Sequence, residues 1–357
     1  MWGQSMSIIT KERKSTNMKK WIQNLKVNLV SETTFTVQGH GVHTAFVEMR
    51  EALQRAGARV FVNSKEKCEI MHIHTIGPYS LFKCLFFKGK KIITAHVVPN
   101  SFLGSLIFAK LWHPLAKLYL RYFYNKADAI QAVSPQVAKE LKEIGVKKEI
   151  FFIPNGVNLQ KFKKNENDRK KIRNKLGIKE NDFVVLDAGQ IQPRKGIETF
   201  INTAKELPDV KFIWIGGIPF KRFAADYSKM QKVQQNAPSN ILFTGTIPFE
   251  DVIPYYSAAD ILFFPSYQEN FPFTVIEAAA SNLPLLLRDL DIYPPIYEEN
   301  YIKGTDENFK SLILKLRDDK ELYDEYAEKA YNVAKKYEIS ILTQELIDIY
   351  KRILEKK

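Results

Sequence analysis

Short apolar runs alternate with longer amphipathic stretches along most of the chain. The amphipathic stretches predict helices at His43–Ala56, Pro135–Gly145, Ile197–Leu207 and Phe273–Ser281. The apolar runs predict strands at Leu25–Val30, Arg59–Asn63, Ile70–Thr75, Lys91–His96, Ala129–Val133, Ile150–Pro154, Phe183–Ala188, Val210–Gly216, Ile241–Thr244, Asp260–Pro265 and Pro284–Arg288. Strands that are apolar on both faces and separated by helices are typical of parallel sheets built from βαβ units.

The strands fall into two series joined by a polar, charged stretch at residues 155–168, as expected of a linker between domains. We therefore predict an α/β protein with two doubly wound parallel-sheet domains that face one another. The first domain is assigned to residues 21–165 and the second to residues 166–335. Residues 336–357 are expected to form a C-terminal helix that packs back toward the first domain. Residues 1–20 are interpreted as a disordered lead-in, and both Met1 and Met18 stay open as the start of translation.

The basic residues are concentrated in the first half of the chain. Lys and Arg total 53 and Asp and Glu total 40, a net charge of +13. Residues 1–156 hold 23 basic and 10 acidic residues, so the excess lies there entirely, and residues 70–127 contain no acid. This asymmetry indicates an anionic partner for one half only, either a nucleic acid or a membrane surface. Two cysteines exclude a disulfide framework, and no apolar run reaches the ~18 residues of a membrane-spanning helix.

Candidate ligand-binding residues follow the predicted strands, because open α/β sheets bind ligands beyond the carboxyl ends of their strands. The segment from Gly189 to Gly196 follows one strand and opens a helix. Backbone N–H groups at a helix start bind anions, and Arg194 and Lys195 add two cations suited to a diphosphate. The segment is not a Walker A loop, because Arg194 stands where that motif needs glycine. Taken alone, it is equally well explained as a helix start with solvated basic residues.

A second element favours the diphosphate interpretation. Glu269 and Glu277 lie eight residues apart across a strand-to-helix turn. Glu269 is placed in the loop, where its carboxylate can accept hydrogen bonds from hydroxyls, and Glu277 lies in the following helix, close enough to hold a ribose. The intervening residues at the helix start, Asn270 to Phe273, offer backbone N–H groups. An isolated pair of this kind would more simply be two solvated carboxylates, but the Arg-Lys-Gly segment upstream favours one shared site.

With these motifs, the sequence resembles the family 4 retaining glycosyltransferases of the GT-B fold over nearly its whole length from Lys26. The resemblance rests on Gly39-His-Gly41, His96, Ala132-Val-Ser-Pro135, Ile153-Pro-Asn-Gly-Val157, Gly189, Arg194-Lys195-Gly196, Gly216-Gly217, Phe243-Thr-Gly245 and the segment from Ser266 through Glu269 to Glu277. It implies transfer of a hexose from UDP-glucose or UDP-galactose with retention of configuration, with the UDP-sugar as co-substrate and no cofactor or metal strictly required.

The resemblance also implies roles for individual residues. Arg194 and Lys195 would clamp the donor diphosphate, Glu269 the donor sugar and Glu277 the ribose, while His96 faces the sugar. His96, Arg194, Lys195 and Glu269 are thus the catalytic candidates. The further donor-binding candidates are Gly39, Gly41, Gly189, Gly217, Gly245, Asn270, Phe271, Pro272, Phe273 and Glu277. Two departures affect this assignment: Asn270 stands where the family usually has glycine, and the first glycine loop lacks a paired Gly-Gly.

More closely, the chain resembles the bacterial glycolipid synthases that glycosylate diacylglycerol or monoglucosyl-diacylglycerol. The segments that carry this resemblance are Ala95–Ser105 and Gln190–Arg194. It implies a lipid acceptor, a site at the inner face of the plasma membrane and a cytoplasmic protein bound there peripherally. The donor sugar, the acceptor, the linkage and the oligomeric state all stay open.

Two apolar, basic segments agree with a lipid acceptor. Leu81–Lys91 and Ser101–Tyr124 combine bulky apolar residues with Lys and Arg and contain no acid, a pattern typical of interfacial helices. Pro114 is expected to split the second segment into two short helices. The candidate membrane and acceptor residues are Lys88, Lys90, Lys91, Phe102, Leu103, Lys110, Trp112 and Lys117. The alternative is that these are core helices with a few exposed lysines. A nucleic-acid partner is disfavoured, because no known binding motif accompanies the charge.

No metal site is predicted. His72 and His74 are interpreted as structural residues on opposite sides of a strand. Asp289 and Asp291 match the D-x-D pattern of metal-dependent sugar transferases, but they follow the helix of Glu277, away from the expected diphosphate site. Two other functions stay open: the same transfer to a soluble or polysaccharide-linked acceptor, and a non-catalytic protein that binds nucleotides or nucleic acid.

Overall fold

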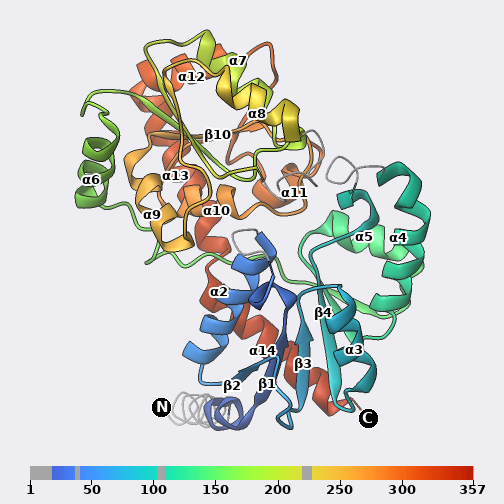
Figure 1. Ribbon diagram of the computed structural model, residues 1–357. Helices are drawn as coiled ribbons and strands as arrows, with labels where there is room; N and C mark the ends of the chain where they lie inside the picture. The colour runs from blue at the N-terminus through green and yellow to red at the C-terminus, as the bar shows by residue number, and fades with distance from the viewer. Residues whose placement is uncertain (1–17, 37–40, 103–108, 219–226, 357) are drawn as a thin grey trace, which may run out of the picture.

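The computed structural model describes residues 18–36, 41–102, 109–218 and 227–356, which form two domains around two six-stranded sheets (Figure 1). The first sheet has the order β2-β1-β3-β4-β5-β6, with β1 at Lys26–Val30, β2 at Arg59–Val62, β3 at Ile70–Ile73, β4 at Lys90–Ala95, β5 at Ala129–Ala132 and β6 at Glu149–Phe152. The second has the order β12-β11-β10-β7-β8-β9, with β7 at Val184–Ala188, β8 at Lys211–Ile215, β9 at Ile241–Phe243, β10 at Ile261–Phe264, β11 at Leu285–Arg288 and β12 at Ile302–Gly304.

All neighbouring strands in both sheets are parallel, which confirms the predicted α/β class with two doubly wound domains. Each predicted strand is present to within about one or two residues at either end. The sequence did not predict β12. This edge strand has only three residues, and its central Lys303 is exposed, so it lacks the continuous apolar run by which the other strands were recognised.

Helices cover both faces of the first sheet. These helices are α2 at Gly41–Arg55, α3 at Pro78–Phe86, α4 at Ala109–Tyr124, α5 at Pro135–Glu143 and α14 at Ile339–Glu355. On one face, Phe46 of α2 and Leu346 of α14 pack with Leu29 of β1 in one core. On the other face, Cys84 of α3 and Leu120 of α4 belong to a separate core cluster.

The C-terminal helix thus belongs spatially to the first domain, and in Figure 1 it runs behind the first sheet. The chain returns from the second domain beside the linker: the Val157 N–H donates to the Tyr337 carbonyl, and the Ile339 N–H donates to the Val157 carbonyl, both at 2.9 Å. Gly156 makes this crossing possible, because a Cβ there would lie 2.9 Å from Ile339 Cα. Two chain segments therefore connect the domains side by side.

The second domain carries the other helices. They are α6 at Glu166–Leu176, α7 at Ile197–Lys205, α8 at Tyr227–Gln235, α9 at Phe249–Ala258, α10 at Phe273–Ala280, α11 at Pro294–Tyr297, α12 at Phe309–Asp318 and α13 at Lys320–Lys336. The second domain also contains the short 3-10 helix η3 at Pro193–Lys195, and the first domain contains η1 at Glu32–Thr34 and η2 at Pro99–Phe102. Buried aromatic side chains fill the core beside β8 and α7; Phe200, Phe212 and Trp214 meet edge to face.

Two local predictions were wrong. Pro114 does not split its segment, because α4 continues through it to Tyr124; the proline removes one backbone donor, while burial of Leu120 and Phe123 holds the helix on the sheet. Residues 18–20, predicted as part of a disordered lead-in, belong to a helix over residues 18–24 whose Ile22 packs in the core of the first domain, and residues 1–17 lie outside the described residues. In the part of the chain that the structure describes, no helix combines the length and apolarity needed to cross a membrane.

Candidate active site

The loops after β7 and β10 join Lys195 to Glu269. Lys195 Nζ lies 2.5 Å from Glu269 Oε1, and Ser266 Oγ donates to the same oxygen at 2.6 Å. The two charged side chains are only 15% and 7% exposed, so solvent screens their attraction weakly. The sequence predicted that Lys195 and Glu269 bind the same sugar donor. The structure places the two side chains in direct contact at the carboxyl edge of the second sheet.

Arg194 supports the same junction through neutral partners. Its Nη1 donates to the Gln268 carbonyl at 3.2 Å, and its Nε donates to Gln192 Oε1 at 3.1 Å. The Arg194 carbonyl in turn accepts the Tyr267 N–H at 2.8 Å. The guanidinium therefore has no acidic partner in these contacts and keeps its full positive charge for an anionic ligand.

Glycines allow the strand ends of the second domain to converge beside these cations. Gly196 has φ +75°, and a Cβ on it would lie 2.3 Å from the Pro265 carbonyl oxygen. Gly216 has φ +133°, and its Cβ would lie 2.1 Å from the Gly189 oxygen. Gly216 also pairs with Gly245 in an isolated bridge. The candidates Gly189, Gly217 and Gly245 thus come together, and no larger residue fits the backbone approach at Gly196 and Gly216.

Glu277 lies buried in α10, where Pro272 precedes the helix as its N-cap. Glu277 is 5% exposed, and its Oε2 accepts a hydrogen bond from the Tyr256 hydroxyl at 2.6 Å. Burial raises the pKa of Glu277 to about 7, with a further increase from Glu48 of the first domain. The carboxyl therefore changes charge near neutral pH, at the position where the resemblance expects the ribose.

Asp187 is a residue that the sequence analysis missed. It is 1% exposed in β7, and its Oδ1 accepts the Ala188 N–H at 2.7 Å. Burial raises the pKa of Asp187 well above its usual range, while the positive charge of Lys195 opposes the shift. A carboxylate inside the otherwise apolar run VVLDA was the available signal, because buried acids are rare without a partner.

On the first domain, His96 follows β4 and belongs to a stack of histidines. The rings of His74 and His96 lie 5.6 Å apart, and the rings of His72 and His74 lie 5.0 Å apart. The prediction that His72 and His74 point to opposite sides was wrong, because residues two apart on a strand share one face. Burial lowers the pKa of His72 to about 3 and that of His74 well below its usual range, so both rings are neutral. Among the described residues, no group of His, Cys, Asp and Glu is arranged to hold a metal ion.

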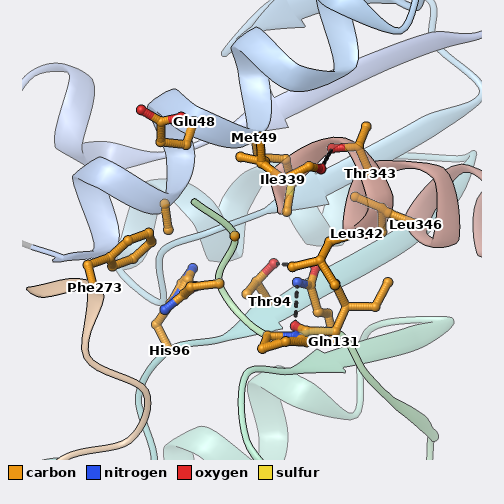
Figure 2. Close-up of a pocket in the computed structure, with 15 residues that line it drawn as sticks. Glu48, Met49, Thr94, His96, Gln131, Phe273, Ile339, Leu342, Thr343 and Leu346 are labelled. Atoms are coloured by element: carbon orange, nitrogen blue, oxygen red, sulfur yellow. Dashed lines mark hydrogen bonds between the residues drawn. The ribbon is translucent and has the colours of Figure 1, made fainter. Parts of the chain in front are cut away.

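The two domains meet at a cleft lined by residues of α2, β4, β5, the linker and α14, together with Phe273 of α10. Figure 2 shows His96 and Phe273 facing each other from the two domains at one end of it, with Leu342 and Leu346 of α14 at the other. Gly41 approaches Phe273 as well, since a Cβ on Gly41 would lie 3.8 Å from its ring. The start of α2 thus approaches the start of α10 across the domain boundary, whereas Arg194, Lys195 and Glu269 are not among the described residues that line this cleft.

The other predicted site residues lie apart from this cleft or outside the described residues. Gly39 and Leu103 lie outside them, and the side chains of Phe102, Lys110 and Trp112 are likewise not described. Lys88 is exposed just after the end of α3, and Lys117 is exposed within α4. Lys90 Nζ donates to the Lys356 carbonyl at 2.8 Å. Lys91 follows at the amino end of β4. Asp289 and Asp291 are exposed after β11.

Comparison with protein families agrees with this geometry. Residues 168–333 match the family described as Glycosyl transferases group 1, and residues 62–161 match Glycosyltransferase Family 4. The first match covers β7 to β12 with the Lys195 and Glu269 loops, and the second covers the His96 side of the cleft.

Curated relatives extend the match along the chain. An α-galactosylglucosyldiacylglycerol synthase of Streptococcus pneumoniae is 34% identical over 340 residues, covering 92% of this chain and 90% of that protein. A processive diacylglycerol α-glucosyltransferase of Acholeplasma laidlawii is 26% identical, covering 93% of this chain and all of that protein.

Solved structures share the fold. A sucrose-phosphate synthase of Thermosynechococcus elongatus has a TM-score of 0.78 at 17% identity, covering 93% of this chain and all of that one. Anabaena HepE in complex with UDP and glucose has a TM-score of 0.73 at 16% identity, covering 92% of this chain and 99% of that one. With two parallel-sheet domains facing across a cleft, and a synthase of glycosylated diacylglycerol 34% identical over nearly its whole length, the chain belongs to the family 4 glycosyltransferases of the GT-B fold.

Proposed function

We propose that this glycosyltransferase moves a glucose or galactose from a UDP-sugar to a membrane lipid acceptor, monoglucosyl-diacylglycerol or diacylglycerol, with retention of configuration. The observation that carries the proposal is the 34% identity, over 92% of the chain, to a synthase whose name describes a dihexosyl-diacylglycerol product. HepE, which has the same fold, is known in complex with UDP-glucose, which supports the nature of the donor.

The contacts at the site support a same-face transfer. Arg194 and Lys195 are placed to stabilise the negative charge that develops on the departing diphosphate. The Glu269 carboxylate is held by Lys195 and Ser266, so it is poorly placed to act as a free nucleophile. We therefore expect the leaving diphosphate to help deprotonate the acceptor hydroxyl, without a covalent glycosyl-enzyme intermediate.

Incubation with labelled donors tests the reaction. The purified enzyme is given UDP-glucose or UDP-galactose together with vesicles that contain diacylglycerol or monoglucosyl-diacylglycerol, and the lipid products are separated. A labelled lipid with one added hexose supports the proposal and identifies the donor and acceptor. Transfer to soluble sugars alone would favour the soluble-acceptor alternative, and a lack of turnover with either donor would contradict the proposed function.

We further propose that the reaction requires no divalent metal. Arg194, Lys195 and the start of α7 supply the positive charge that a metal would otherwise supply to the diphosphate. Activity is expected to stay within about twofold after treatment with EDTA and removal of the chelator. Complete loss of activity with EDTA, restored by Mg²⁺ or Mn²⁺, would contradict this and would direct attention to Asp289 and Asp291.

The first domain offers a surface for the membrane. Phe82, Leu85 and Phe86 of α3 and Leu115, Leu118 and Tyr122 of α4 are exposed, up to 70% for Phe86; we call these six residues the apolar helix face. The two helices cover the same face of the first sheet (Figure 1), and Lys88, Lys117 and Arg121 are exposed on or beside them. Apolar side chains flanked by basic residues are the composition of an interfacial surface. We propose that this face binds anionic lipid and holds the cleft near the acceptor.

Substitution of the apolar helix face tests membrane binding. The variant Phe82→Ser, Phe86→Ser, Leu118→Ser should bind anionic vesicles at least about tenfold more weakly, because exposed apolar side chains gain free energy only when lipid covers them. Added NaCl should also weaken binding of the wild type, because part of the attraction is Coulombic. Phe152→Ser is the matched control, since Phe152 is exposed at the sheet edge outside both helices. Equal sedimentation of the triple variant and wild type would contradict the proposal.

A further inference from the structure

Asn270 connects the loop between β10 and α10, residues 265–272, to the first domain; we call this segment the donor loop. This residue stands where the family usually has glycine, directly after Glu269. Its side-chain Nδ2 donates to the His96 carbonyl oxygen and to Ser101 Oγ, both at 3.1 Å. Both partners belong to the first domain, 174 and 169 residues away in sequence. A glycine could form neither bond, so these contacts distinguish this chain from the usual family pattern.

The loop around Asn270 is tied in three directions by consecutive residues. Glu269 holds Lys195 within the second domain. Asn270 holds the first domain, and the Phe271 carbonyl accepts a hydrogen bond from Asn155 Nδ2 of the linker at 3.1 Å. A loop has no repeating backbone hydrogen bonds, so such side-chain contacts determine its conformation. The position of the Glu269 carboxylate therefore depends on the first domain, because the adjacent Asn270 is hydrogen-bonded to it.

On the first domain, the partners of Asn270 lie at the two ends of one compact turn. The Val98 N–H donates to Ser101 Oγ at 3.2 Å, and the Ser101 N–H donates to the Val98 carbonyl at 2.9 Å. His96 begins this turn and faces the cleft (Figure 2), and η2 at Pro99–Phe102 leads toward α4. The Asn270 amide thus contacts the turn that carries His96. The same turn continues into η2, which contacts α4 of the apolar helix face.

We propose that Asn270 is a positioning residue that sets Glu269 and His96 at the correct separation across the domain boundary for transfer. The donor loop and the turn from His96 to Ser101 belong to different domains. In enzymes generally, a misplacement of about 1 Å between reacting groups lowers turnover by up to about 100-fold. The proposal rests on the glycosyl transfer described above, but not on the identity of the acceptor. Asn270 acts here through Glu269 and His96 and needs no contact with substrate.

The isosteric variant Asn270→Asp tests the donated hydrogen bonds. It keeps the size of the side chain but presents an acceptor to the His96 carbonyl, so that bond is lost, whereas the Ser101 hydroxyl can reverse its role and donate to the new carboxylate. We expect kcat to fall about tenfold or more, while UDP affinity measured by calorimetry stays within about twofold. Asn202→Asp is the matched control, because Asn202 is exposed on α7, away from the domain interface. Wild-type kcat in Asn270→Asp would overturn the proposal.

A double-mutant cycle separates positioning from a purely structural role. Ser101→Ala, Asn270→Gly and their combination are compared by kcat and by melting temperature. If the Asn270 amide acts through Ser101, Ser101→Ala lowers kcat in the wild-type background and has no further effect beside Asn270→Gly. Additive effects, or losses of kcat that follow losses of melting temperature, would overturn the proposal. A wild type that turns over no nucleotide sugar would instead contradict the proposed function, so the two failures are distinguishable.

Discussion

Replacing Lys195 by alanine is expected to lower kcat by about 100-fold or more, the size seen when one preorganised charge that stabilises a leaving group is removed. Lys195 Nζ contacts Glu269, its positive charge opposes the rise in the pKa of Asp187, and it lies in the loop that opens α7. Without it, the diphosphate leaves with one positive charge fewer in a site that solvent screens weakly. Single-turnover measurements with labelled UDP-sugar give the rate of the chemical step directly.

The same substitution leaves the buried Glu269 carboxylate without its cation. Breaking a buried pair costs about 3–5 kcal/mol, so Lys195→Ala is also expected to unfold at lower temperature. Arg194→Ala keeps the test informative, because the hydrogen-bond partners of the Arg194 side chain among the described residues are neutral. This variant should lose a comparable amount of kcat with little change in melting temperature. Lys205→Ala, at an exposed position of α7, is the control. If both Arg194→Ala and Lys195→Ala turn over within a few-fold of wild type, the diphosphate binds elsewhere.

Replacing Glu277 by glutamine is expected to weaken binding of UDP by about tenfold and to stabilise the fold at alkaline pH. An ionised carboxylate accepts hydrogen bonds from ribose hydroxyls more strongly than an amide does. The pKa of Glu277 is about 7 in the folded protein and near 4.5 when the chain is unfolded, so folding takes up a proton between these values. Stability of the wild type therefore falls as pH rises from 4.5 to 7, by on the order of 3 kcal/mol. Glutamine does not ionise, so the Glu277→Gln variant does not lose this free energy of unfolding as pH rises.

Melting curves and calorimetry at two pH values test this pair of effects. Glu277→Gln should melt close to wild type at pH 5, where the carboxyl is protonated, and at higher temperature than wild type at pH 8. UDP affinity of the wild type should rise as pH increases through about 7 and that of the variant should not. Glu180→Gln, at an exposed position, is the control. A difference in melting temperature that is the same at both pH values would show that Glu277 is ionised in the folded protein throughout this range.

The amino-acid sequence by itself determined the two sheets and the order in which they are built. Strands buried on both faces need continuous apolar runs, and these are visible without coordinates, as at Ile261–Phe264 and in the three leucines of Leu285–Arg288. Motif spacing also predicted that Lys195 and Glu269 serve one site, because the loops after parallel strands lie at one edge of the sheet. The short edge strand Ile302–Gly304 was missed, since its burial depends on its neighbour β11 more than on its own residues.

The tertiary structure decided the contacts that cross between distant segments. Asn270 looked like an irregularity in a donor motif, and only the meeting of the two domains gave its amide the partners His96 and Ser101. Asp187 lies in an apolar strand, and only the return of the Lys195 loop brings a cation close to it. Tyr350, near the end of the chain, reaches His72 at 2.6 Å because α14 crosses back onto the first sheet. Periodicity and spacing report on local structure, whereas such pairs depend on how whole domains pack, and no local pattern encodes that.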